Sequence, residues 1–279
     1  MSQAQPDRDN FCYRHPDRQS FVLCQRCGRT ICGECQTPAA VGVVCPECMA
    51  EQRRSAPRQV RPTILTASSE APVVTYAIIA ICAVVYVLQL VTGNVVTNAL
   101  SYAGAYSMPD TGVAFQPWRM VTAAFVHGNF LHLALNLYTL FLFGRILEPM
   151  LGRVRYLALY LMSAFGGSLA VMFLANPFQG VVGASGAIFG LMGAFLVIQR
   201  RLGGDMTGLL VLVGINLVIG FVPGFGISWQ AHLGGLVVGA IIGLILFETR
   251  RRNQKNLQIG LLVAVAVVLV VASLTFVFV

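Results

Sequence analysis

Apolar segments separated by short polar stretches fill the chain from residue 73 to its last residue. Each segment approaches the roughly 20 residues that a helix needs to cross a bilayer, although the fourth is shorter. The pattern predicts an all-α polytopic membrane protein with seven transmembrane helices. We expect them at Val73–Val91, Val121–Phe143, Tyr156–Leu174, Ser185–Ile198 with its flanks, Gly208–Phe225, Trp229–Phe247 and Ile259–Phe278.

Composition and charge agree with this interpretation. Of the 279 residues, 56% are apolar and only 11% are charged, and the mean hydropathy is +0.73. The net charge of +8 would suggest nucleic acid as the partner of a soluble protein. Here the basic residues cluster at 53–61, 145–155, 200–201 and 250–255, between the apolar segments. This distribution follows the positive-inside rule, so we expect contact with the lipid bilayer and no nucleic-acid partner.

The region before residue 62 carries many charges and no apolar run, which predicts that no signal peptide is present and that the amino terminus is cytosolic. Odd-numbered segments then run outward, and all four basic clusters fall in the cytosol. The external loops carry only Asp110 and Arg119 as charges near their ends. We therefore expect a multi-pass protein of the cell membrane.

Potential metal ligands come in four pairs near the amino terminus, and two residues separate the members of each pair. Two such pairs complete a tetrahedral zinc site, so eight ligands imply two Zn²⁺ ions. Disulfides are the alternative, but a cytosolic region keeps its thiols reduced. Each ion could be bound by consecutive ligand pairs (sequential pairing) or by alternate ones (crossed pairing). The short spacing between the second and third pairs favours crossed pairing. The pairs are Cys12 and His15, Cys24 and Cys27, Cys32 and Cys35, and Cys45 and Cys48.

So small a region cannot build an adequate apolar core, so we expect metal binding and folding to be coupled. The crossed arrangement resembles B-box type zinc fingers. Residues 1–52 contain no obvious catalytic group, and we interpret them as a zinc-binding module with a binding or regulatory role toward a protein partner. Residues 53–72, rich in Arg, Ser and Pro, are expected to form a basic flexible linker that can touch anionic headgroups.

A serine stands at the start of the fourth apolar segment, within the tetrad Gly183–Gly186. At a helix N-terminus, Ser185 would have free backbone N–H groups beside it that can stabilise an oxyanion. Close packing of small residues is the alternative meaning of such a tetrad. His232 opens the sixth segment at the same expected depth and can act as a base for the serine. Gly186 and Gly235 lie on glycine-rich faces that would let the two helices approach.

Further polar residues accompany this pair. His132 and Asn136 are four apart on one helical face and can donate hydrogen bonds to an oxyanion. His127 is a third histidine in an apolar segment, for which a hydrogen bond to a neighbouring helix is the alternative role. Phe189 can pack against the imidazole of His232. No acidic residue is expected at the right depth to orient His232, so the sequence predicts a dyad.

Taken in order, these motifs resemble the rhomboid intramembrane serine proteases over roughly residues 73–248. The resemblance implies a six-helix core in which Ser185 is the nucleophile and His232 the general base and acid. It also implies that His132 and Asn136 help to form the oxyanion hole. The motifs are Trp118 and Arg119; His127, His132 and Asn136; Gly144, Glu148 and Gly152 in a Gly-x3-Glu-x3-Gly pattern; Gly183 to Gly186; and Ala231, His232, Gly235 and Gly239.

The resemblance implies roles for three more features. Trp118 and Arg119 would belong to a loop half-immersed in the outer leaflet, and Glu148 would tie together the cytoplasmic end of the second helix. From the residues alone, these would be a lipid-interface anchor and a helix-end salt bridge. This chain has Phe189 where the family often has Tyr. Residues 249–279, a basic loop and a seventh helix, resemble the six-plus-one arrangement of some members.

The sequence thus predicts an endopeptidase that cleaves transmembrane protein substrates in or near their membrane segments. Its site would open toward the external face and need no cofactor for catalysis, with zinc structural in the amino-terminal module. A transporter is an alternative, against which we see no inverted repeat and no acidic residue at mid-membrane. An inactive rhomboid relative acting as a scaffold is another, against which Ser185 and His232 are intact. Cys82 has no assigned role beyond that of a small core residue.

Overall fold

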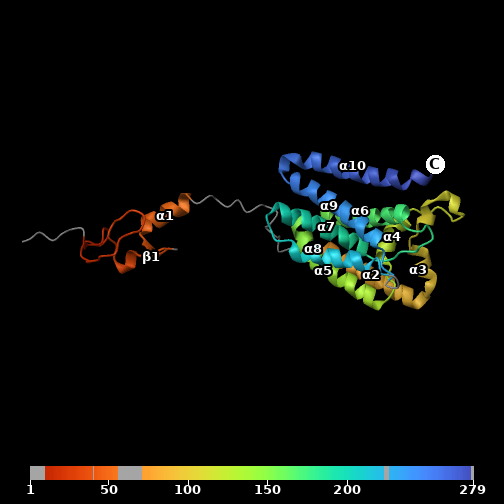
Figure 1. Cartoon of the computed structure of the whole chain (residues 1–279), viewed down its shortest axis with the longest axis horizontal. Helices are drawn as coiled ribbons and strands as arrows, with labels where there is room; N and C mark the ends of the chain where they lie inside the picture. Colours follow the sequence, from red (N-terminus) through yellow and green to blue (C-terminus); the bar gives the residue numbers. More distant parts are fainter. Residues whose placement is uncertain (1–9, 40, 56–70, 223–225, 278–279) are drawn as a thin grey trace, which may run out of the picture. The chain divides into compact units, whose positions relative to one another are not determined.

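The computed structural model describes residues 10–39, 41–55, 71–222 and 226–277. The chain divides into two compact units, residues 1–60 and residues 61–279 (Figure 1). We call them the cysteine-rich unit and the helical unit. Most of the predicted linker 53–72 lies outside the described residues.

The cysteine-rich unit has little regular structure. It contains a 3₁₀ helix η2 at Gly33–Cys35, a two-stranded antiparallel sheet and a terminal helix α1 at Pro46–Ser55. Strand β1 (Thr37–Pro38) pairs with β2 (Val43–Val44), with Thr37 opposite Val44 and Pro38 opposite Val43. Its buried apolar side chains are six cysteines together with Ile31 and Val44. Cysteine side chains therefore make up most of the core of this unit.

The helical unit contains nine α-helices and five short 3₁₀ helices among its described residues. The α-helices are α2 (Val73–Thr92), α3 (Asn94–Leu100), α4 (Arg119–Thr122), α5 (Phe130–Leu151), α6 (Arg153–Leu174), α7 (Ser185–Arg201), α8 (Thr207–Ile219), α9 (Trp229–Glu248) and α10 (Lys255–Ser273). The 3₁₀ helices are η4 (Gly104–Ser107), η5 (Pro109–Thr111), η6 (Ala123–Phe125), η7 (Arg252–Gln254) and η8 (Thr275–Val277). The chain is thus an all-α multi-pass membrane protein, as the apolar pattern predicts.

Five of these helical segments are long and apolar enough to cross a membrane: α2, α5, α6, α9 and the stretch Arg252–Val277 that contains α10. The other two predicted spans form shorter helices: α7 has 17 residues and α8 has 13. Most residues of α7 are buried against other helices. By contrast, only 6% of the residues in the most apolar stretch of the α10 segment are buried. Helix α10 runs along the outside of the unit (Figure 1).

The predicted bounds of the second span, Val121–Phe143, are wrong. The helix α5 begins at Phe130, and residues before it form α4 and η6. Asn129 sets this start because its backbone is extended and its side-chain oxygen accepts the N–H of His132 at 2.8 Å. The apolar composition continues across this break, so hydropathy alone misses it.

Helices α6, α7 and α9 pack against one another at the centre of the unit (Figure 1). Glycines let their backbones touch: a Cβ atom placed on Gly235 would overlap the carbonyl oxygen of Gly186, and one on Gly239 would overlap that of Gly190. A Cβ atom on Gly234 would likewise overlap the backbone of α6. Small residues permit such close helix approach in membranes. This contact positions the start of α7 against the start of α9.

Candidate active site

Ser185 is the first residue of α7 and is partly buried. The turn before it depends on Gly183, whose φ of +120° is rarely adopted by residues with side chains. The N–H of Gly183 donates to the carbonyl of Ala123 at 2.9 Å, which ties the turn to η6. Ser185 therefore stands at a helix N-terminus whose first N–H groups have no partners within the helix.

His232 lies in the first turn of α9, and its imidazole stacks on the ring of Phe189. The ring centroids are 4.0 Å apart and the planes differ by 10°. Because Phe189 follows Ser185 by four residues on α7, both side chains share one helix face. The predicted contact between Phe189 and His232 is present.

The residues next to Ser185 and His232 meet where the backbones of α7 and α9 touch. A Cβ atom on Gly186 would lie 3.3 Å from the carbonyl oxygen of Ala231, which places the residues after Ser185 and before His232 in contact. Within the described part of the chain, Ser185 and His232 are not hydrogen-bonded to each other. The Nδ1 atom of His232 is buried and has no hydrogen-bond partner among the described residues. No described carboxylate therefore orients this imidazole.

His132 brings a ring nitrogen close to the serine turn. Its Nδ1 atom accepts the N–H of Gly128 at 3.3 Å, so the ring proton resides on Nε2. A Cβ atom placed on Gly183 would be 2.7 Å from this Nε2 and 3.8 Å from Oγ of Ser185. A ring N–H donor thus lies beside the serine, separated from it by the space that the missing Gly183 side chain leaves open.

Asn136 lies one turn further along α5. One N–H of its amide donates to the carbonyl of His132 at 2.8 Å, and its oxygen is buried without a hydrogen-bond partner in the described structure. The second amide N–H is not used by any described residue. Asn136 therefore stabilises the helix turn that carries His132 and retains one donor.

His127 is almost fully buried, and its ring lies edge-on to that of His132 with centroids 5.3 Å apart. Neither ring nitrogen has a hydrogen-bond partner among the described residues, which contradicts the alternative of a hydrogen bond to a neighbouring helix. Its backbone is held by Gln89 of α2: the amide donates to the carbonyl of His127 at 3.0 Å and accepts its N–H at 3.1 Å. The sequence interpretation missed Gln89, although it is the one amide side chain in α2.

Trp118 and Arg119 have different environments. Trp118 is exposed, whereas Arg119 is only 7% exposed. The guanidinium of Arg119 donates to the carbonyls of Asn98 and Ser101 and packs 4.1 Å from the ring centroid of Tyr106. Arg119 thus ties the end of α3 to the loop before α4, and the interpretation as a surface anchor does not hold for it.

Glu148 is buried near the end of α5 and caps α2. Its two carboxylate oxygens accept the N–H groups of Val74 and Thr75 at 2.8 Å each and the Thr75 hydroxyl at 2.7 Å. A carboxylate is favourable at a helix N-terminus. The expected salt bridge at this helix end is absent among the described residues. A Cβ atom on Gly144 would overlap the Thr75 side chain, and Gly152, at φ +85°, separates α5 from α6.

The cysteine-rich unit gathers its ligands into two groups, in each of which the ligand atoms lie within 4.8 Å of one another. The arrangement is crossed, as the spacing favours, and all eight cysteines of the chain are free, which contradicts the disulfide alternative. Arg29 donates to Sγ of Cys27 at 3.3 Å, and this hydrogen bond lowers the pKa of the Cys27 thiol. Each group can hold one metal ion. The first consists of Cys12, His15, Cys32 and Cys35, and the second of Cys24, Cys27, Cys45 and Cys48.

Comparison with known proteins places this arrangement in a family. Residues 114–249 match the family model described as Rhomboid domain. RHOMBOID-like protein 6, mitochondrial, of Arabidopsis thaliana is 34% identical over 203 residues, which are 64% of this chain and 65% of that protein. Rhomboid protease GluP of Bacillus subtilis (strain 168) is 33% identical over 208 residues, 70% of this chain and 39% of that protein. In both cases the match spans less than two thirds of the relative.

A shorter relative is covered almost completely. Putative rhomboid protease YdcA of Bacillus subtilis (strain 168) is 32% identical over 189 residues, which are 65% of this chain and 92% of that protein. The family model begins well after the cysteine-rich unit, which is therefore an addition to the matched domain. By these sequence matches, the chain belongs to the rhomboid family.

Proposed function

We propose that the chain is an intramembrane serine endopeptidase that hydrolyses peptide bonds in or near the transmembrane segments of other membrane proteins. The observation that carries the proposal is the meeting of α7 and α9, which sets Ser185 at a helix N-terminus and stacks His232 on Phe189 of the same helix. Two relatives, YdcA and GluP, carry names that describe them as rhomboid proteases.

In the proposed reaction, His232 accepts the hydroxyl proton of Ser185 while Oγ attacks the carbonyl carbon of the substrate. The resulting oxyanion would be stabilised by the N–H of Ser185, the Nε2–H of His132 and the free amide N–H of Asn136. Collapse of this intermediate breaks the C–N bond, and His232 returns the proton to the leaving amine. Water then hydrolyses the acyl-enzyme with His232 again as the base.

Catalysis by a dyad is consistent with the buried, unpartnered Nδ1 of His232. In enzymes of this type a carboxylate often orients the imidazole. Here the ring of Phe189 would take over that positioning through stacking. Serine–histidine hydrogen bonds are commonly long in a free enzyme and shorten when substrate binds. No cofactor is required for these steps.

We further propose that the amino terminus is cytosolic and that the site opens toward the external face. The basic clusters at 145–155, 200–201 and 250–255 lie at or near the ends of α5, α7 and α9, whereas Ser185 and His232 lie at the starts of α7 and α9. The positive-inside rule assigns the basic ends to the cytosol. Substrates would then be cleaved near the outer ends of their membrane segments.

For the cysteine-rich unit we propose two structural Zn²⁺ ions and a role in binding a protein partner. Three cysteines with one histidine, and four cysteines, are both common zinc ligand sets. The ligands supply most of the buried side chains of the unit, so the ions would also supply most of its folding free energy. We assign this module to residues 1–52 and the protease core to residues 73–248.

Cleavage of a reporter transmembrane protein by the purified chain in liposomes tests the proposed activity. We expect Ser185→Ala and His232→Ala each to lower kcat by about 10⁴-fold or more, as found for residues that act as one catalytic unit. Ser273→Ala, a serine variant in α10, is the matched control and should keep the wild-type rate. All four proteins should elute identically in size-exclusion chromatography.

A serine-reactive fluorophosphonate supplies a second measurement. If Ser185 is labelled in the wild type and not in His232→Ala, the dyad is competent even where the chosen reporter is not cleaved. Folded protein that neither cleaves nor reacts would instead favour an inactive family member that binds membrane proteins.

A further inference from the structure

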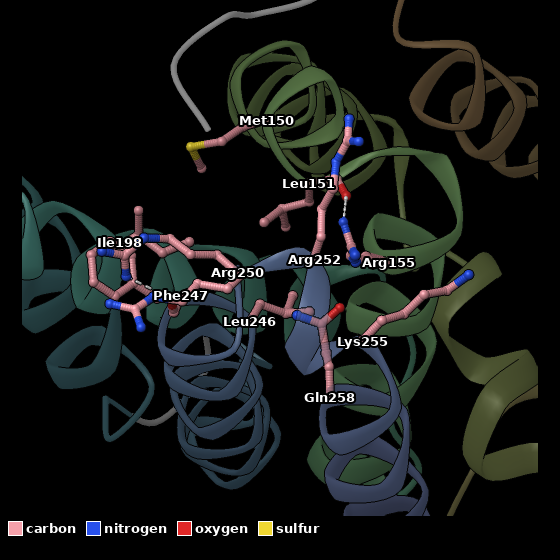
Figure 2. Close-up of a pocket in the computed structure, with 11 residues that line it drawn as sticks. Met150, Leu151, Arg155, Ile198, Leu246, Phe247, Arg250, Arg252, Lys255 and Gln258 are labelled. Atoms are coloured by element: carbon pink, nitrogen blue, oxygen red, sulfur yellow. Dashed lines mark hydrogen bonds between the residues drawn. The ribbon is translucent and has the colours of Figure 1, made fainter. Parts of the chain in front are cut away.

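A cavity of about 440 Å³ lies at the end of the helical unit opposite to the Ser185 turn. It is lined by the last residues of α5, α7 and α9, by the start of α6, and by the segment that leads into α10 (Figure 2). The catalytic proposal uses none of its residues. The family model ends at residue 249, so the wall formed by residues 250–258 lies beyond the matched domain.

The cavity concentrates uncompensated positive charge. Within the described part of the chain, no carboxylate lies within salt-bridge distance of any of its cationic side chains, whereas nearby Arg201 pairs with Glu248 at 3.1 Å. Two of the guanidinium groups bond instead to helix-end carbonyls, Arg250 to Phe247 at 2.8 Å and Arg155 to Leu151 at 3.4 Å. The cationic side chains are Arg155, Arg250, Arg251, Arg252 and Lys255.

Most of the other side chains that line the cavity are apolar. Leu151, Ile198 and Leu246 line the cavity and are all buried. Figure 2 shows Arg155, Arg252 and Lys255 grouped on one side, with Ile198 and Phe247 on the other. The cavity is therefore amphipathic, and it lies where membrane-spanning helices end, at the depth of lipid headgroups.

A buried hydrogen bond fixes the wall that residues 249–258 form. The amide of Gln258, which is 3% exposed, donates to the hydroxyl of Thr249 at 2.9 Å and to its carbonyl at 3.2 Å. These contacts close the connection between α9 and α10 and keep Arg252 and Lys255 at the cavity. The site is thus held by the fold and does not depend on free loop residues.

We propose that this cavity binds the headgroup of an anionic phospholipid. The phosphate would lie between Arg155, Arg252 and Lys255, because guanidinium and ammonium groups bind phosphate oxygens through charge-assisted hydrogen bonds. The glycerol and the first part of the acyl chains would contact the apolar wall of Leu151 and Leu246. A soluble phosphate shares the first interaction but not the second, so the lipid is the occupant that uses both walls.

The experiment uses the full chain in detergent micelles and measures its unfolding temperature against added dioctanoyl phosphatidylglycerol, dioctanoyl phosphatidylcholine or inorganic phosphate. The pocket variant is Arg252→Gln/Lys255→Gln. The matched control is Arg145→Gln/Arg200→Gln, which removes the same charge from residues of α5 and α7 that do not line the cavity. All four positions are exposed, and size-exclusion chromatography checks the fold.

We expect phosphatidylglycerol to bind the wild type at least tenfold more tightly than phosphatidylcholine does. One cation near an anionic surface contributes roughly fivefold, so the pocket variant should lose at least tenfold in affinity for phosphatidylglycerol. The control should stay within about twofold to threefold of the wild type. The single variant Lys255→Gln should weaken binding by roughly fivefold and serves if the double variant fails to fold.

Three outcomes would overturn the proposal. Equal losses in both double variants would show that general surface charge, and not the cavity, attracts the lipid. Equal binding of the two lipids by the wild type would remove the anionic headgroup as the ligand. Stabilisation by inorganic phosphate as strong as that by phosphatidylglycerol would identify a site for a soluble anion instead.

Discussion

The interior of the cysteine-rich unit and the contact between α7 and α9 are packed in opposite ways. In the first, the interior is filled by ligand side chains, and only Ile31 and Val44 join the cysteines as buried apolar residues. In the second, glycines take the place of larger side chains at the closest point, and the backbones at Gly186 and Gly235 touch. One interior is therefore filled by side chains that can bind metal ions, and the other depends on close backbone approach at its glycines.

The largest expected effect is the loss of bound zinc from the cysteine-rich unit, and it tests the crossed pairing of the ligands. Cys12→Ser/Cys32→Ser removes two ligands of one group, whereas Cys12→Ser/Cys24→Ser removes one ligand from each group. Because each site needs four ligands, we expect the first variant to keep about one zinc ion per chain and the second to keep almost none. Zinc content by atomic emission measures this difference.

Sequential pairing would reverse these two results, so the same pair of variants discriminates between the two schemes. Reporter cleavage by the same variants tests whether the helical unit is active independently of the cysteine-rich unit. We expect the reporter to be cleaved by both variants, since the cysteine-rich unit contributes no residue to the proposed dyad. Loss of all turnover in the zinc-free variant, with the helices still folded, would show that the units depend on each other.

A smaller but still severe effect is expected at the helix contact. Gly235→Ala adds a methyl group that overlaps the carbonyl oxygen of Gly186, so α7 and α9 must separate. Displacement of catalytic groups by about 1 Å costs roughly 100-fold in rate, and we expect a loss of this size together with a lower unfolding temperature. Gly214→Ala in α8, where nothing lies within 4 Å of the added atom, is the control.

The control variant should keep wild-type activity and be as stable or slightly more stable, because alanine favours a helix over glycine. If Gly235→Ala cleaves the reporter as fast as Gly214→Ala does, the close backbone contact is not what aligns Ser185 with His232.

The smallest expected effect concerns the hydrogen bonds that Gln89 makes to the backbone of His127. Gln89→Leu leaves the buried N–H and carbonyl of His127 without partners, at a cost of about 1 to 3 kcal/mol for each group. The turn that leads to His132 should shift, so we expect kcat to fall roughly tenfold while KM changes little. Steady-state kinetics on the reporter in liposomes give both values.

Thr97→Val is the matched control, because it removes only the hydroxyl that Gln89 contacts at 2.8 Å and keeps both bonds to His127. An equal loss of kcat in both variants would assign the effect to the α2–α3 contact and not to the positioning of His127.

The parts of this structure that the sequence predicts are those set by local spacing. Pairs of ligands two residues apart identify the metal-binding turns, and Ser185 stands at a helix start because a glycine turn precedes an apolar run. The contact between Phe189 and His232 follows from helical periodicity on α7 and from the glycines that bring α9 close. In the first two cases neighbours in the sequence determine the geometry, and in the third the spacing of residues within each helix indicates which faces can meet.

Other features depend on partners distant in the sequence, and the pattern does not reveal them. The start of α5 is set by the side chain of Asn129 within a continuous apolar stretch. Arg119 looks like a surface charge and is buried, because carbonyl groups from the end of α3 surround it. The catalytic roles of Ser185, His232, His132 and Asn136 stay predictions until the variants are measured.

The cap that Glu148 forms on α2 has a consequence for biosynthesis. Helix α2 is made before α5, so its first N–H groups at Val74 and Thr75 wait for a carboxylate that lies 73 residues or more further along the chain. The arrival of α5 therefore completes the hydrogen bonding at the amino end of α2.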